Sequence, residues 1–233
     1  KRYEPLRQEM RAILNAQDKI AWPSWRGGMI YNFWQDAEHV RGLWRRAALA
    51  EYRKKDPKWE IILDVDKLGR DENESWVYKG ASCRAPLYTK CLLSLSRGGK
   101  DAVVVREFDA ALSTFVAGGF AIPEAKHRLE WLSDDELLVG SDFGPGTLTK
   151  SGYPRTIRRW SRGAALSSAP VVFEGLESDV SVDPASFENE TGRFVMIQVA
   201  KTFFETEYHR MTSDGKFRRL ALPLDTEIED WDG

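Results

Sequence analysis

Hydrophobic and polar positions alternate in short segments along most of this chain. After residue 23, apolar or alternating runs of about five to eight residues are separated by Gly, Asp, Asn and Pro, a pattern typical of β-strands joined by turns. The stretch 4–18 differs, because its apolar residues recur with the helical period: Leu6, Met10, Ile13 and Leu14. We therefore predict one N-terminal helix followed by strands.

The predicted strands recur as a group. Four times, bulky apolar residues lead into an arginine, and these arginines lie about 50 to 60 residues apart: Arg46, Arg106, Arg159 and Arg210. An apolar strand such as "MIYNFW" or "DELLVGS" precedes each arginine, and a further strand such as "WEIILD" or "PVVFEG" follows it. About four strands per repeat predict the blades of a β-propeller.

This periodicity predicts an all-β chain with a short helical start. We expect a helical segment over 1–22 and a partial β-propeller domain over 23–233, with blades of four antiparallel strands at about 24–66, 75–117, 127–175 and 178–222. The first blade lacks a clear innermost strand in the sequence. The tail "DTEIEDWDG" has the polarity of a segment that begins a fifth blade.

The segment "MIYNFWQDAEHVRGLWRRAAL" (29–49) mixes aromatic rings with arginines, which also suits a nucleic-acid surface. The net charge argues against a nucleic-acid surface, because the chain has 34 basic and 36 acidic residues and a formal charge of -2, whereas binding to phosphates favours a positive protein. We therefore interpret 29–34 and 42–49 as the two middle strands of the first blade. The arginine of each blade is expected to pair with a carboxylate or to stack on a ring, with a polyanion site as the alternative.

Motifs for catalysis are missing from the sequence. The nearest match to the G-x-S-x-G turn of α/β-hydrolases is "GASCR" (80–84), which lacks the second glycine, so Ser82 is read as a turn residue. The histidines are far apart in sequence and are expected at the surface or in packing: His39, His127 and His209.

Metal and cofactor motifs are missing as well, since there is no H-E-x-x-H and no C-x-x-C. We expect no cofactor. The two cysteines, Cys83 and Cys91, are too few for a disulfide framework and are read as free thiols. Four aspartates beside strands are read as turn formers: Asp64, Asp66, Asp134 and Asp135.

Four segments together resemble the N-terminal β-propeller of bacterial prolyl oligopeptidases (prolyl endopeptidases), a family of serine peptidases. They are "YNFWQDAEHVRGLWRRAALAEYR", "WEIILDVDKL", "SLSRGGKDAVVVREFD" and "LLVGSDFGPGTLTKSGYPRTIRRW". The likeness runs from about residue 4 to about residue 221. It implies a propeller with about seven blades that caps an α/β-hydrolase catalytic domain, with peptide bound in the cavity between them.

The resemblance implies a parent protein that cleaves short peptides after proline, in which the propeller restricts access to the catalytic domain. The partners of this chain would be the α/β-hydrolase domain of the same parent chain and short proline-containing peptides. The 233 residues carry no recognisable catalytic triad, so we expect the chain alone to be inactive. By the same resemblance, the loop 141–155 faces the substrate cavity through Phe143, Tyr153 and Arg155. A solvated loop that packs on its own blade is the alternative.

Two other classes of function remain open at this stage. A four-bladed propeller is also known as a stand-alone module, which would bind a protein or peptide partner through its loops. A carbohydrate-acting hydrolase would need a pair of carboxylates that the sequence does not locate. We expect neither a nucleic-acid nor a membrane partner. We do expect self-association through open propeller edges, and a bacterial cytoplasmic or periplasmic location.

Overall fold

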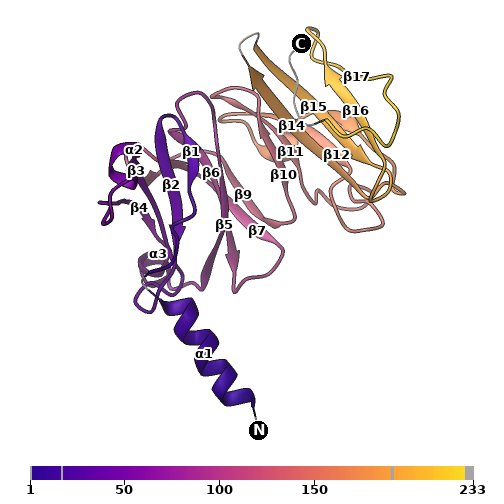
Figure 1. Ribbon diagram of the computed structural model, residues 1–233. Helices are drawn as coiled ribbons and strands as arrows, with labels where there is room; N and C mark the ends of the chain where they lie inside the picture. The colour runs from indigo at the N-terminus through magenta and orange to yellow at the C-terminus, as the bar shows by residue number, and fades with distance from the viewer. Residues whose placement is uncertain (1, 17, 190–191, 229–233) are drawn as a thin grey trace. The chain divides into compact units, whose positions relative to one another are not determined.

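The computed structural model describes residues 2–16, 18–189 and 192–228. Four separate antiparallel sheets follow one another along the chain, and the strands of each sheet pair in sequence order, except that β9 of the second sheet pairs with β7 (Figure 1). The chain divides into two compact units, Lys1–Ile122 and Pro123–Gly233. Each unit contains two sheets, which confirms the predicted class of β-propeller blades with a short N-terminal helix.

The first blade has four strands, including the innermost strand that the sequence left unclear. Its strands are β1 (Ser24–Arg26), β2 (Met29–Trp34), β3 (Leu43–Ala48) and β4 (Glu60–Asp64). Gly27 and Gly28 form the two-residue turn between β1 and β2, both with positive φ. Such turns match the twist of a hairpin and favour glycine. The glycine pair that follows the helical stretch therefore forms the first turn of the first blade.

The second blade has an interrupted outer strand. Its strands are β5 (Trp76–Cys83), β6 (Lys90–Arg97), β7 (Val103–Asp109), β8 (Thr114–Phe115) and β9 (Ala121–Ala125). Both β8 and β9 pair with β7. Two sequence interpretations are wrong here: Ser82 lies within β5 rather than in a turn, and Cys83 and Cys91 form a disulfide rather than free thiols. The cysteines are directly opposite each other on β5 and β6, a proximity that sequence separation alone did not reveal.

The third and fourth blades make up the strands of the second unit. The third contains β10 (Arg128–Trp131), β11 (Glu136–Gly140), β12 (Thr156–Ser161) and β13 (Val171–Glu174), with a short 3-10 helix at Leu166–Ser168. The fourth contains β14 (Ser181–Asn189), β15 (Gly192–Ala200), β16 (Thr206–Met211) and β17 (Phe217–Arg219). No strand is assigned between 220 and 228, and the rest of the tail lies outside the described residues.

Three α-helices occur among the residues that the structure describes, all in the first unit. They are α1 (Tyr3–Asn15), α2 (Leu49–Tyr52) and α3 (Val65–Glu72). The predicted N-terminal helix is confirmed, whereas α2 and α3 were missed. Asp64 caps α3 by accepting a hydrogen bond from the backbone N–H of Lys67, and Asn73 ends it in the left-handed conformation. Asp66 therefore lies in a helix, not in a turn as the sequence suggested.

Burial is concentrated where blades of one unit share apolar side chains. In the first unit, one core cluster combines residues of the first and second blades, among them Tyr31, Trp44, Leu93 and Phe108. In the second unit, another cluster combines the third and fourth blades, among them Leu138, Ile157, Val182 and Ile197. These clusters confirm that rings of segment 29–49 are used for packing.

The arginine that recurs in each blade occupies one equivalent register. Each lies on the third strand, opposite a buried apolar residue of the second: Arg46 opposite Tyr31, Arg106 opposite Leu93, Arg159 opposite Leu138 and Arg210 opposite Met196. Two arginines make paired hydrogen bonds with a carboxylate, Arg46 with Glu60 and Arg159 with Glu136.

The other two members of this set contact rings. The guanidinium carbon of Arg106 is 3.6 Å from the ring centroid of Phe115, and its Nη1 donates to Glu72. The guanidinium carbon of Arg210 is 4.8 Å from the ring centroid of Phe194. The prediction of carboxylate pairing or ring stacking is therefore confirmed at all four positions.

Candidate functional site

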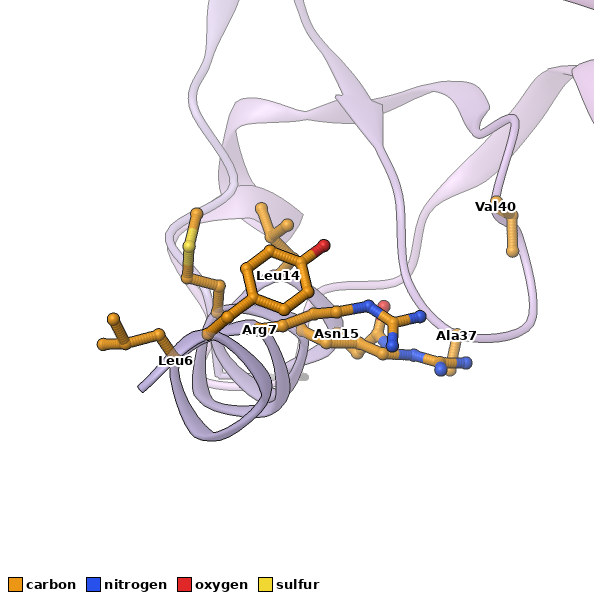
Figure 2. A pocket seen from close by; sticks show the side chains of 9 residues that line it. Leu6, Arg7, Leu14, Asn15, Ala37 and Val40 are labelled. Atoms are coloured by element: carbon orange, nitrogen blue, oxygen red, sulfur yellow. The ribbon is translucent and has the colours of Figure 1, made fainter. Parts of the chain in front are cut away.

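Helix α1 presents an apolar face that nothing in the described structure covers. None of its residues is buried, and its large apolar side chains are more than half exposed, Met10 at 62% for example. This face and the turn between β2 and β3 enclose a concavity of about 640 Å³, lined by Tyr3, Leu6, Arg7, Met10, Arg11, Leu14, Asn15, Ala37 and Val40. Figure 2 shows Leu6 and Leu14 on the helix and Ala37 and Val40 on the neighbouring turn. Such a surface favours contact with another apolar surface.

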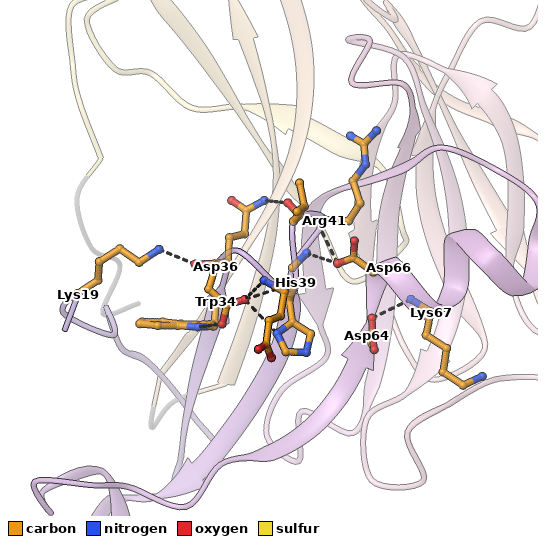
Figure 3. Close-up of polar contacts among 12 residues, drawn as sticks. Lys19, Trp34, Asp36, His39, Arg41, Asp64, Asp66 and Lys67 are labelled. Carbon is orange, nitrogen blue, oxygen red and sulfur yellow. Dashed lines mark hydrogen bonds and ion pairs between the residues drawn. The ribbon is translucent and has the colours of Figure 1, made fainter. Parts of the chain in front are cut away.

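The β2–β3 turn beside this face is organised around the buried carboxylate of Asp36. Its oxygens accept hydrogen bonds from the backbone N–H groups of Glu38 and His39 at 2.9 and 2.8 Å, and from the indole of Trp34 at 2.9 Å. The Nδ1 atom of His39 lies 3.1 Å from Oδ1 of the same carboxylate (Figure 3). One side chain therefore satisfies most of the polar groups that this turn would otherwise leave unpaired.

These contacts change the titration of Asp36. Burial by itself would raise the pKa of the carboxyl, because the charged form loses hydration. The hydrogen bonds from the His39 backbone, the Trp34 indole and the Glu38 backbone favour the charged form and together outweigh burial. The pKa of Asp36 is therefore held well below its ordinary value.

Two further contacts place α1 and α3 against the same turn. Lys19 Nζ donates to the carbonyl of Leu14, at 2.6 Å, and to the carbonyl of Gln35, at 2.5 Å, which links the end of α1 to the turn. On the other side, Oδ2 of Asp66 accepts hydrogen bonds from the backbone N–H groups of Arg41 and Gly42 (Figure 3). The turn is thus held from both sides while α1 remains exposed.

Each of the three predicted cavity residues contacts a different neighbour. The Phe143 ring lies 4.1 Å from the guanidinium of Arg158, and the Tyr153 ring lies 4.7 Å from Lys126 Nζ. Arg155 Nη1 donates to Glu174 at 2.6 Å and to the carbonyl of Gly175 at 2.8 Å. A groove of about 490 Å³ does run along the same loop, but its lining is other residues: Asp142, Gly144, Pro145, Gly146, Leu148, Thr149, Lys150 and Glu177.

The histidines have structural neighbours. His127 Nε2 is 2.8 Å from the carbonyl of Pro123, and His209 lies between Glu207 and the ring of Phe173. Burial lowers the pKa of His209, and the nearby Glu207 opposes this effect only in part. Within the described residues, no three His, Cys, Asp or Glu side chains are grouped as metal ligands.

The sequence predicted α1 as a helix but did not indicate that its apolar face is exposed. Its apolar spacing is the same as that of a helix buried in a core, so only the coordinates show that the face is uncovered. No helix among the described residues is both long and apolar enough to cross a membrane.

Comparison with known proteins gives matches over nearly the whole chain. The family described as "Prolyl oligopeptidase, N-terminal beta-propeller domain" matches residues 2–232. A protein of Sinorhizobium fredii named "Uncharacterized peptidase y4nA" is 42% identical over 231 residues, which are 97% of this chain and 32% of that protein.

Solved structures show the same relationship. A post-proline cleaving enzyme from Rickettsia typhi superposes with a TM-score of 0.88 at 27% identity, over 97% of this chain and 34% of that one. Oligopeptidase B from Leishmania major shares the fold, with a TM-score of 0.67 at 13% identity over 92% of this chain and 30% of that one. The chain thus spans about a third of the length of these relatives.

We predict that Asp36→Asn destabilises the chain by about 1–2 kcal/mol at pH 7, because the amide is a weaker acceptor for four converging contacts. Since the folded-state pKa of Asp36 lies below its ordinary value of 3.8, the contribution of the carboxylate is present above that pH and is lost as the pH falls through the folded-state pKa. The difference in unfolding free energy between Asp36→Asn and the unsubstituted chain should therefore become smaller below about pH 4. Urea unfolding followed by tryptophan fluorescence at several pH values measures it.

The matched control is Asp101→Asn, at an exposed aspartate of the β6–β7 turn. It should change the unfolding free energy by less than about 0.5 kcal/mol. Equal effects of the two substitutions would contradict the central role of Asp36.

Proposed function

This chain belongs to the N-terminal β-propeller family of prolyl oligopeptidases, and on that premise we propose that its parent is a serine endopeptidase that cleaves short peptides after proline. The observation that carries the proposal is the family match over residues 2–232, together with the four antiparallel sheets of blade topology. The similarity to an enzyme described as post-proline cleaving supports the choice of substrate class.

In this proposal the chemistry belongs to the part of the parent that these 233 residues do not include. A histidine, oriented by an aspartate, takes the proton of a serine that attacks the peptide carbonyl; the C–N bond breaks, the histidine protonates the departing amine, and water then hydrolyses the acyl-enzyme. The propeller acts as a filter, because stacked rigid sheets admit an extended short peptide and exclude a folded protein.

The apolar face of α1 is proposed as one contact with the remainder of the parent. The face consists of large, solvent-exposed apolar side chains. Lys19 links the end of the helix to one end of the first blade. The remainder of the parent, about twice the length of this chain judging from the lengths of the relatives, would supply the surface that covers this face.

The loop 141–155 is retained as a proposed substrate contact. Its support is the groove along the loop, together with the placement of Arg155 at the loop's end with one exposed ion-pair partner, Glu174. In the proposed complex, a peptide carbonyl or carboxylate replaces Glu174 as the hydrogen-bond partner of Arg155.

We expect the 233-residue chain alone to show no turnover of a chromogenic prolyl-amide peptide and no labelling by a serine-reactive probe. The full-length parent should show both, with the labelled serine outside these residues. Enzyme assays and peptide mapping by mass spectrometry provide the measurement. Labelling of a serine within the chain would overturn the division of roles.

Replacement of Met10 tests the contact proposed for α1. In the parent, Met10→Glu should lower the unfolding free energy by about 2 kcal/mol, because a charge would enter an apolar interface. In the chain alone the same change should have almost no effect, since Met10 is exposed there. Ala12→Glu, on the same helix but outside the concavity, is the control. Equal loss in chain and parent would argue against the contact.

Replacement of Arg155 tests the loop. In the parent, Arg155→Ala should reduce kcat/KM for short proline peptides by about tenfold through a higher KM, if a charged hydrogen bond to substrate is lost. Arg162→Ala, which removes an ion pair with Asp135 in the same blade, should leave KM unchanged. Steady-state kinetics decide the matter, and an unaltered KM in the Arg155 variant removes this residue from the substrate site.

A further inference from the structure

Two adjacent phenylalanines form the tip of the turn between β15 and β16. Phe203 and Phe204 are 92% and 88% exposed, more than any other exposed large apolar side chain of the described residues. Single exposed apolar residues are ordinary on a protein surface, but here two consecutive large rings are almost fully exposed on one short turn. The third and fourth blades bury their own apolar side chains elsewhere, so these rings contribute nothing to that core.

The turn that carries the rings is held by polar contacts. Lys201 donates its backbone N–H to the carbonyl of Glu205 at 2.8 Å, and Phe204 donates its N–H to Thr202 Oγ1 at 3.2 Å. Lys201 Nζ is anchored on the buried carboxylate of Asp179 at 2.9 Å. Because the turn is already ordered, little conformational entropy would be lost when the rings become buried.

Topology relates this turn to the one beside α1. The β15–β16 turn joins the second and third strands of its blade, as the β2–β3 turn does in the first blade (Figure 1). The β2–β3 turn contributes Ala37 and Val40 to the open concavity beside the apolar face of α1. Equivalent turns of two different blades therefore each carry an uncovered apolar surface.

The apolar area of the two rings indicates which kind of partner surface can bury them. Two phenylalanine side chains offer at most about 400 Å² on their own side, below the roughly 600 Å² that each partner contributes to the smallest stable interfaces between separate molecules. A second copy held by this tip alone would therefore dissociate. A surface in the same polypeptide needs much less area, because the connection supplies a high effective concentration.

We propose that Phe203 and Phe204 insert into an apolar depression on the remaining two thirds of the parent peptidase. The inference rests on the proposed function in one respect, because it requires the longer parent whose relatives are about three times the length of this chain. The tip thereby fixes the fourth blade to the rest of the protein through a contact separate from α1.

Cysteine accessibility in the folded parent tests this contact directly. Phe203→Cys and the control Leu112→Cys, which is 74% exposed on the β7–β8 turn, are each labelled with a maleimide. Peptide mapping separates these sites from any other cysteine, and Cys83 and Cys91 are protected by their disulfide. The labelling rate of each variant unfolded in urea is the reference for full accessibility.

We expect Phe203→Cys in the folded parent to react at least about tenfold more slowly than its unfolded reference, while Leu112→Cys reacts within about threefold of its own. Equal, rapid reaction at both positions would overturn the proposal. Slow reaction at Phe203→Cys that becomes fast on dilution would assign the contact to a second copy and would also overturn it.

A second variant guards against local disturbance by the new cysteine. Phe204→Cys should show the same protection, since both rings lie on one tip. Peptide cleavage is measured in parallel and kept separate: a parent that labels as expected but cleaves no proline peptide would refute the proposed function and leave this contact standing.

Discussion

Face-to-face burial of neighbouring sheets is the constraint on which the rest of this structure depends. A four-stranded antiparallel sheet has two faces, and in each unit two sheets bury apolar side chains in one shared cluster. The rings of Trp44 and Phe108, from different blades of the first unit, lie 6.0 Å apart between centroids. Strand residues are therefore largely committed to packing, and side chains available for function are found in turns and in α1.

The turns meet a second requirement, because a turn must satisfy its own backbone hydrogen bonds. In the β2–β3 turn this is done by Asp36 from within and by Asp66 from α3. In the β15–β16 turn it is done by Thr202 and Glu205. Both turns are consequently ordered without help from apolar contacts, which leaves their apolar neighbours free to meet another surface.

The arginines illustrate how one residue type serves structure in one place and remains a candidate for function in another. Those on the third strands share one register and are occupied by carboxylates or rings, so their recurrence reflects the repeat of the blade. Arg155 stands outside that register, at the end of a long loop, and its carboxylate partner Glu174 is largely exposed. Position relative to the repeat, rather than charge, separates the two cases.

The sequence by itself determined the helix, the middle strands and the four-blade repeat, because periodicity and turn residues are local properties that survive in any context. It also carried the family resemblance. Only the tertiary structure decided which apolar side chains remain exposed to solvent. Leu6 in α1 and Leu93 in β6 are the same residue type, yet Leu6 is exposed and Leu93 is buried because of what packs around each. The disulfide of Cys83 and Cys91 and the exposure of Phe203 were also decided only by the tertiary structure. Each depends on contacts or cover that pairing and packing of distant segments create, and local sequence patterns do not contain that information.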